Sequence, residues 1–178
     1  MAKIADNLVD NFARCFAFTL SEEGGFTNNA ADPGNWTGGV VGHGVLRGTK
    51  YGISAAAYPG LDIENISEQD AEEIYRRDYY APLQGDALKL PVGLVLFDGA
   101  VNAGLRRAVV WLQQAVGQSA DGVLGSKTLE AVGAADPLVL AREILARRID
   151  FYARLPTWPN FGLGWSRRVI ALAGEILR

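Results

Sequence analysis

The sequence predicts a mainly α-helical protein with one long irregular segment near its start. Over most of the chain, apolar residues recur at intervals of three and four, which is the period of an amphipathic helix. Capping residues and glycines stand where these periodic stretches begin and end. Residues 26–52 instead have no helical period and are rich in Gly, Asn, Asp and Thr. The length of 178 residues suits one domain over residues 1–178 with a sizeable buried core.

The first helix is predicted over residues 4–23, with an apolar stripe that includes Phe12 and Phe16 and a glycine pair beyond its end. The long loop follows, and a short hairpin is expected within residues 40–53. Loops of this length are uncommon in compact domains and tend to be functional.

Helical signals return after this loop. A capping-box pattern at Ser67 opens a helix over residues 68–80. An apolar helix is expected from Pro91 to residue 104, and another from residue 106 until Gly117 ends it.

The last third of the chain continues the helical pattern. Asp121-Gly122 marks a turn, and Ser126 can cap the helix that follows. Asp136-Pro137 begins a long helix to about Leu155, and Trp165 begins the last helix.

Nothing in the sequence predicts a membrane span or an export signal. No apolar run approaches the ~18–20 residues of a transmembrane helix, so no stable membrane association is expected. Asp6 and Asp10 interrupt what would be the apolar core of a signal peptide. We therefore expect synthesis in the cytoplasm.

Several kinds of site are disfavoured by residue content. The single cysteine, Cys15, excludes an internal disulfide and a cysteine-based zinc cluster. The single histidine, His43, stands among glycines, which favours a loop residue over a metal ligand or a member of a Ser-His-Asp triad. The glycine-rich stretch lacks the Gly-Lys-Ser/Thr order of a phosphate-binding loop. No metal and no cofactor are expected.

The net charge of −3 is divided unevenly along the chain. Residues 1–100 carry 14 acidic and 7 basic residues, a net of −7, whereas residues 137–178 carry 3 acidic residues and 7 arginines, a net of +4. The arginines follow a helical pattern, which favours a solvated helix face over a patch for polyanions. Nucleic acid is not an expected partner.

Two acids end the first predicted helix, where the negative end of the helix dipole disfavours carboxylates. With Leu8 as zero and 100° per residue, Glu23 falls at ~60° on the apolar stripe and Glu22 at ~320°, at its edge. Burial and the dipole would both raise the pKa of Glu23, as a general acid needs. The alternative is that Glu23 frays into solvent beside the glycines and has no role.

Asp32 follows in a loop that can fold back toward the end of this helix. Alone it is weak support for a site, because Asp is common in turns. Together with Glu23 it suggests two carboxyl groups in different environments, one protonated and one ionised. This is the arrangement that hydrolyses glycosidic bonds.

The motifs "EGGF", "DPG" and "GTKYGIS", in this order, resemble the signature of glycoside hydrolase family 108, whose members are N-acetylmuramidases, many of them phage endolysins. The likeness continues through "EQDAEEIYRRDYY", "LFDGAVNAG", "LQQAVGQSADGVLGSKTLEAV" and "FGLGWSRRV", and so covers nearly the whole chain. It implies a lysozyme-like helical domain in which the irregular segment, with a little β structure, forms one side of a cleft. The catalytic motifs would lie in about residues 1–100 and a helical part in about residues 101–178.

By this resemblance Glu23 is the general acid, and Asp32 holds the attacking water or stabilises the oxocarbenium-like transition state. A threonine would help to place that water. Thr49 matches the family position before Tyr51, whereas Thr37 lies at nearly the lysozyme-like distance from Asp32. We prefer Thr49 as the catalytic threonine, with Thr37 and Tyr51 as substrate-binding candidates. The spacing of Glu23, eight residues, Asp32 and then a threonine also resembles that of tailed-phage lysozymes, and this likeness implies an inverting reaction.

The sequence departs from the family pattern beside these residues. Asn35 stands where the second glycine of Asp-Pro-Gly-Gly is usual, and extra residues precede Thr49. Either threonine assignment therefore depends on how the loop folds.

Other polar and aromatic residues are candidates for substrate binding. Trp36 could stack on a sugar ring, with partial burial in the core as the alternative. Asp98 and Asn102 share one face of an apolar helix and need polar partners there. They either cap a neighbouring segment or face the cleft, and the family likeness favours the cleft for Asn102. The stretch 117–132 resembles small peptidoglycan-binding modules, although a turn and a capped helix would look the same.

The resulting prediction is a monomeric, bacteriolytic peptidoglycan hydrolase of the endolysin type. It would cleave the β-1,4 bond between N-acetylmuramic acid and N-acetylglucosamine in glycan strands, after a holin-type release to the wall. One alternative is a lytic transglycosylase, which commonly uses a single acid and forms an anhydro sugar. The other is a non-catalytic wall-binding or secretion-associated protein.

Overall fold

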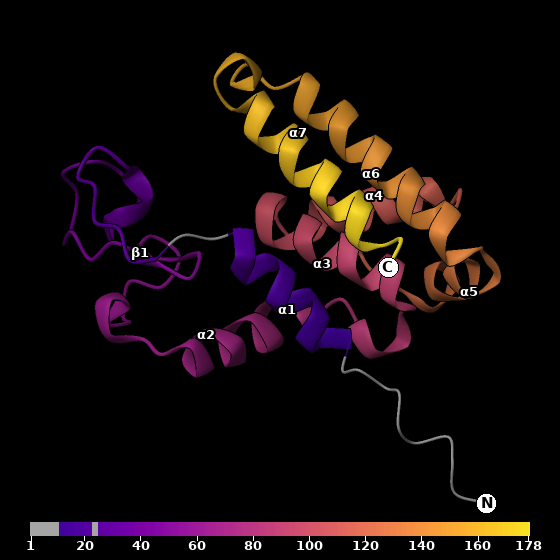
Figure 1. Cartoon of the computed structure of the whole chain (residues 1–178), viewed down its shortest axis with the longest axis horizontal. Helices are drawn as coiled ribbons and strands as arrows, with labels where there is room; N and C mark the ends of the chain where they lie inside the picture. Colours follow the sequence, from indigo (N-terminus) through magenta and orange to yellow (C-terminus); the bar gives the residue numbers. More distant parts are fainter. Residues whose placement is uncertain (1–10, 23–24) are drawn as a thin grey trace, which may run out of the picture. The chain divides into compact units, whose positions relative to one another are not determined.

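A computed structural model of the whole chain describes residues 11–22 and 25–178 (Figure 1). The described residues form seven α-helices and one small antiparallel sheet, which confirms the predicted mainly helical fold with a little β structure. They divide into two compact units: a loop unit, residues 16–76, and a helical unit, made of residues 77–178 and the described residues up to Cys15. No helix within the described ranges is both long and apolar enough to cross a membrane.

The loop unit holds most of the irregular segment. Its elements are the second half of α1 (Asn11–Glu22), η1 (Pro33–Asn35), β1 (Thr49–Lys50), β2 (Ile53–Ser54), η2 (Ile63–Asn65) and α2 (Glu68–Tyr75). The strands pair with Thr49 opposite Ser54 and Lys50 opposite Ile53. Tyr51 and Gly52 connect them with φ values of 52° and 74°, as a two-residue hairpin turn requires. The expected hairpin therefore lies at the end of the predicted range.

The loop unit has a small core of its own between its helices and its hairpin. The rings of Phe16 in α1 and Tyr75 in α2 lie 5.8 Å apart, and Ile53 and Ile63 are buried. The start of α2 is the predicted capping box, in which Ser67 and the third residue of the helix exchange side-chain and backbone hydrogen bonds. Local signals and a few apolar contacts thus hold a unit that is largely loop.

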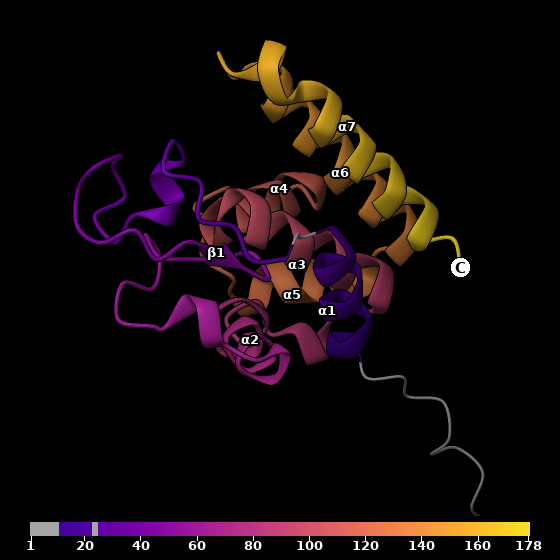
Figure 2. The ribbon, with the colours of Figure 1, turned by 60° about the vertical axis from the view of Figure 1, so that its left-hand side comes forward.

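The segment from residue 76 onward is helical almost throughout. Its elements are η3 (Arg76–Tyr80), η4 (Gly85–Ala87), α3 (Leu90–Ala103), α4 (Leu105–Ala115), α5 (Ser126–Ala134), α6 (Pro137–Ala153) and α7 (Trp158–Glu175). Helix α3 is central, because every residue from Val92 to Ala100 is buried and α3 packs against α4 and α6. Figures 1 and 2 show α6 and α7 side by side as a pair of long helices.

One predicted helix start and one predicted cap are wrong. Helix α7 begins at Trp158 rather than Trp165, because Pro159 is tolerated in a first turn and Gly162 lets the Trp158 ring pack on the helix. A Cβ at Gly162 would lie 2.6 Å from that side chain. Helix α5 has Gly125 at its N-cap and Ser126 inside its first turn, so the Ser126 side chain does not cap it.

Candidate active site

Asn35 is the centre of the polar contacts in the loop unit. Its side chain is fully buried; Nδ2 donates to the carbonyl of Asn29 (3.0 Å) and Oδ1 accepts from the hydroxyl of Thr49 (2.7 Å). Its backbone carbonyl accepts from the N–H groups of Arg47 (2.9 Å) and Gly48 (3.0 Å). A buried amide satisfied in this way fixes distant parts of the long loop against each other.

Asp32 caps the single helical turn that leads into Asn35. Its Oδ1 accepts from the N–H of Gly34 at 2.8 Å, and its backbone carbonyl accepts from the N–H of Asn35 at 3.2 Å. The residue is exposed, and its Oδ2 accepts no hydrogen bond from any described residue. One carboxylate oxygen therefore orients the side chain, and the other is open to solvent or a ligand.

Thr49 is held by its own backbone and by Asn35. Its backbone exchanges two hydrogen bonds with Thr27, at 2.8 and 2.9 Å, and its Oγ1 donates to Asn35. The preceding Gly48 has φ +82°, and a Cβ there would lie 2.4 Å from the Thr27 carbonyl oxygen, so only glycine fits. Asp32 and Thr49 are thus connected through one buried residue, because the Asn35 N–H donates to the Asp32 carbonyl and the Asn35 side chain accepts from the Thr49 hydroxyl.

Trp36 and Thr37 follow Asn35 directly and are both half-buried. The Trp36 indole Nε1 donates to the carbonyl of Ala30 at 2.9 Å. The backbone of Trp36 forms an isolated antiparallel β-bridge with Leu46. The Thr37 hydroxyl oxygen accepts from the N–H of Val45 at 2.9 Å, which leaves its own proton free to donate. The loop therefore positions both candidates without burying either in the core.

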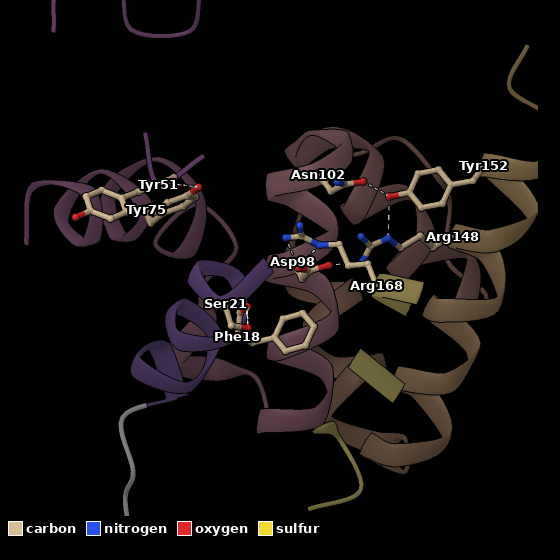
Figure 3. A network of polar contacts seen from close by, with 9 residues as sticks. All are labelled: Phe18, Ser21, Tyr51, Tyr75, Asp98, Asn102, Arg148, Tyr152 and Arg168. Atoms are coloured by element: carbon tan, nitrogen blue, oxygen red, sulfur yellow. Dashed lines mark hydrogen bonds and ion pairs between the residues drawn. The ribbon is translucent and has the colours of Figure 1, made fainter. Parts of the chain in front are cut away.

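Tyr51 lies at the hairpin turn of the same unit. Its carbonyl accepts from the hydroxyl of Tyr75 in α2 at 2.9 Å (Figure 3). The Lys50 ammonium lies 5.3 Å from the centre of the Tyr51 ring and donates to the carbonyls of Glu64 and Ile66 at 2.8 and 2.9 Å. These contacts tie the turn to η2 and α2.

Glu23, the predicted general acid, lies outside the described residues. Helix α1 is described as far as Glu22, and in its last turn Ser21 Oγ donates to the carbonyl of Phe18 at 2.7 Å (Figure 3). The geometry of the site therefore concerns Asp32 and Thr49, and the role of Glu23 stays a prediction.

Asn102 belongs to the helical unit, where a buried polar network ends at its side chain (Figure 3). Asp98 is fully buried; it accepts at Oδ2 from Arg148 Nη1 (2.5 Å) and at Oδ1 from Arg168 Nε and Nη2 (3.0 and 2.8 Å). The Tyr152 hydroxyl accepts from Arg148 Nε at 2.8 Å and donates to Asn102 Oδ1. Burial raises the pKa of Tyr152, which favours the protonated hydroxyl that can donate.

The network orients the Asn102 amide. Arginine can only donate, so the Tyr152 hydroxyl oxygen accepts a hydrogen bond from Arg148. The hydroxyl proton of Tyr152 is therefore the one that is donated to Asn102. Asn102 is exposed, and its amino group is directed away from Tyr152. The partners predicted for Asp98 and Asn102 are therefore side chains of α6 and α7 rather than the end of a capped segment.

A pocket of about 400 Å³ also opens in the loop unit, lined by Phe26, Asn28, Leu46, Arg47, Gly60, Asp62 and Glu64. Neither Asp32 nor Thr49 lines it. Among residues 11–22 and 25–178, no group of three or more His, Cys, Asp or Glu side chains is arranged to hold a metal ion.

The stretch 117–132 contains a turn held by one buried amide. Gln113 Nε2 donates to Asp121 Oδ1 (2.7 Å) and to the Val123 carbonyl (3.0 Å), and Gln113 Oε1 accepts from the N–H of Gly122 (2.8 Å). Hydrogen bonds from the Val123 N–H and from Gln113 lower the pKa of Asp121. This confirms the predicted Asp121-Gly122 turn.

Asn35 and Gln113 are the organising residues that sequence reasoning missed. Asn35 was visible as a departure from the family glycine, in a loop otherwise made of small and turn-forming residues. A side chain that replaces glycine there must fill space and satisfy its amide, so a buried hydrogen-bonding role could have been inferred. Gln113 gave no such signal, because its partners are set by folding of the loop after α4.

Comparisons with known proteins extend over most of the chain. Residues 16–104 match the family described as glycosyl hydrolase 108, and residues 107–170 match the family described as predicted peptidoglycan domain. The solved structure of SagA from Brucella abortus is 32% identical, with a TM-score of 0.78 over 93% of this chain and 93% of that chain. No curated protein matches the sequence.

Proposed function

The chain belongs to the glycosyl hydrolase 108 family, and from this premise we propose that it is an N-acetylmuramidase. The two family matches together make it a glycoside hydrolase with a role in peptidoglycan. The proposed reaction is hydrolysis of the β-1,4 bond between N-acetylmuramic acid and N-acetylglucosamine. The observation that carries the proposal is the Asp32 carboxylate, which has one oxygen fixed by Gly34 and one open, within the matched segment.

In the proposed mechanism Glu23 donates its proton to the glycosidic oxygen as the bond to the anomeric carbon breaks. A water molecule attacks that carbon from the other face and transfers a proton to the open oxygen of Asp32. The oxygen of the water becomes the new anomeric hydroxyl, so the product anomer is inverted. Solvent water then takes the proton from Asp32 and returns one to Glu23, which restores both carboxyl groups for the next turnover.

Thr49 is proposed to hold this water together with Asp32. Its hydroxyl proton is donated to Asn35, so its oxygen has lone pairs available to accept from water. Thr37 differs, because its oxygen already accepts from Val45 and its proton is the free group. We propose that Thr37, Trp36, Tyr51 and Asn102 contact the glycan.

The first experiment compares wild type, Glu23→Gln and Glu22→Gln on purified peptidoglycan. We expect wild type and Glu22→Gln to lower the turbidity and to release fragments with ordinary reducing ends. Glu23→Gln removes the general acid and should reduce the rate at least about a hundredfold. The two adjacent substitutions change charge equally, so they are matched controls.

The products distinguish the alternatives. Anhydro-muramic ends would identify a lytic transglycosylase, and binding without any turnover would identify a wall-binding protein. Proton NMR of the first-formed anomer tests inversion directly, because a retained anomer would contradict the role given to Asp32.

We further propose a monomeric endolysin that is made in the cytoplasm and reaches the wall after a holin-type partner opens the membrane. This proposal is supported by the family likeness alone. Expression in a bacterial cytoplasm should cause lysis only when the membrane is permeabilised, and lysis without permeabilisation would contradict it. Light scattering of the purified chain measures the oligomeric state.

A further inference from the structure

A basic pocket of about 300 Å³ lies in the helical unit between α4 and α6. We call it the arginine pocket; it is lined chiefly by Arg107, Trp111, Arg147, Asp150, Phe151 and Arg154. All of these residues belong to the segment that matches the predicted peptidoglycan domain, and none belongs to the candidate active site.

The charge of the arginine pocket is mostly uncompensated. Arg147 donates to the Glu143 carboxylate at 2.6 Å and to the Gln114 carbonyl at 3.3 Å, so its charge is paired. Arg107 and Arg154 are exposed and form no ion pair within the described part of the chain. An anion that enters the pocket can therefore pair with two guanidinium groups that are not already paired with a carboxylate.

One of these guanidinium groups is already positioned. Arg107 lies over the face of Phe151, with 4.3 Å from its central carbon to the ring centre. Phe151 in turn packs against the buried ring of Trp111 at 5.7 Å. Stacking holds the plane of the guanidinium while leaving its N–H edge free, and this edge matches a carboxylate.

The pocket also contains an acid and an apolar wall. Asp150 is exposed, and its carboxylate accepts no hydrogen bond from the described residues. It can therefore bind an ammonium group. Val110 and the Phe151 ring offer surface for small apolar side chains. Free carboxylates, an amine and alanine methyl groups occur together in the peptides of peptidoglycan, whereas its glycan carries neutral acetamido and hydroxyl groups.

We propose that the arginine pocket binds the carboxylates of the wall peptides, with Arg107 and Arg154 as the principal donors. The proposal rests on the proposed function, since it assumes that peptidoglycan is the substrate. It adds a second contact to the polymer, directed to the peptide rather than to the sugar.

The test measures binding of a glycan-free wall tetrapeptide by calorimetry. Wild type is compared with Arg107→Gln/Arg154→Gln and with the control Arg142→Gln/Arg167→Gln, which removes two exposed, unpaired arginines of α6 and α7 outside the pocket. We expect the dissociation constant to rise about tenfold or more in the pocket variant and to stay unchanged in the control. Circular dichroism shows whether each variant is folded.

Ligand controls test the chemistry. Amidation of the peptide carboxylates should abolish binding, and an N-acetylglucosamine oligomer should not compete. Equal affinity of both double variants would overturn the proposal, as would equal competition by inorganic phosphate at the same concentration. Wild-type hydrolysis of peptidoglycan is measured in parallel: hydrolysis without peptide binding refutes the pocket alone, whereas peptide binding without hydrolysis refutes the proposed function alone.

Discussion

Asp98 shows how one buried residue can determine the stability of the helical unit. Its carboxylate is fully buried and held by the two buried arginines Arg148 and Arg168, which come from different helices. Removing such a carboxylate leaves two cations without their partner in a medium of low dielectric constant. The surface pair of Arg14 and Glu175 has partly exposed side chains, where water screens the charges.

We predict that Asp98→Asn lowers the free energy of unfolding by about 3–5 kcal/mol. Arg14→Gln, which removes the partly exposed pair, should cost at most about 1 kcal/mol. Urea denaturation of the two variants measures both values. A similar small loss in both would mean that the buried network contributes little to stability.

At the scale of elements, α2 illustrates a helix start that depends on one acid. The backbone N–H and the hydroxyl of Ser67 both donate to Asp70 Oδ2 at 2.7 Å, and the Asp70 N–H donates back to Ser67 Oγ at 3.1 Å. The hydrogen bond from the Ser67 side chain, followed by the one from its backbone, lowers the pKa of Asp70 below 3.8. A depressed pKa means that folding favours the ionised form.

We predict that Asp70→Asn destabilises the protein at neutral pH and that this difference shrinks in acid. The contribution of Asp70 is present above its unfolded pKa and is lost as the pH falls through the lower folded pKa. Thermal melts of wild type and variant between pH 2 and pH 7 measure the difference. Glu68→Gln removes a negative charge from the same first turn but leaves the capping box intact, so it is the matched control.

At the scale of the whole molecule, two consecutive segments match families of different description. Residues 16–104 match the hydrolase family and residues 107–170 the peptidoglycan family, and the chain resembles SagA over nearly its full length. The proposed catalytic residues all lie in the first segment and the arginine pocket in the second. Catalysis and part of the wall binding are therefore expected to depend on different residues.

We predict that Glu23→Gln, although inactive, sediments with purified peptidoglycan as well as wild type does. The reason is that the substitution leaves every residue of 107–170 unchanged. A sedimentation assay at two salt concentrations measures the bound fraction, and higher salt should reduce it for both proteins because exposed charges are screened. Loss of binding in Glu23→Gln would show that the active site itself is the main anchor.

Local signals in the sequence predicted several elements correctly. Ser67 begins α2, Pro91 lies in the first turn of α3, and Asp136 caps α6. The physics of a cap or a first-turn proline acts over only three or four residues, so it can be read without the fold. The start of α7 at Trp158 could not be predicted, because it depends on an aromatic ring that packs across Gly162.

The helical class, the hairpin, most helix starts and the family-like order of Glu23, Asp32 and Thr49 could all be read from the sequence. The tertiary structure alone decided which polar groups meet. Asn35 is hydrogen-bonded to Thr49, which is 14 positions away in the sequence, and Asp98 to Arg168, which is 70 positions away. Such partners are chosen by how apolar surfaces pack, because a buried polar group must be satisfied by whatever donor or acceptor the packing brings to it.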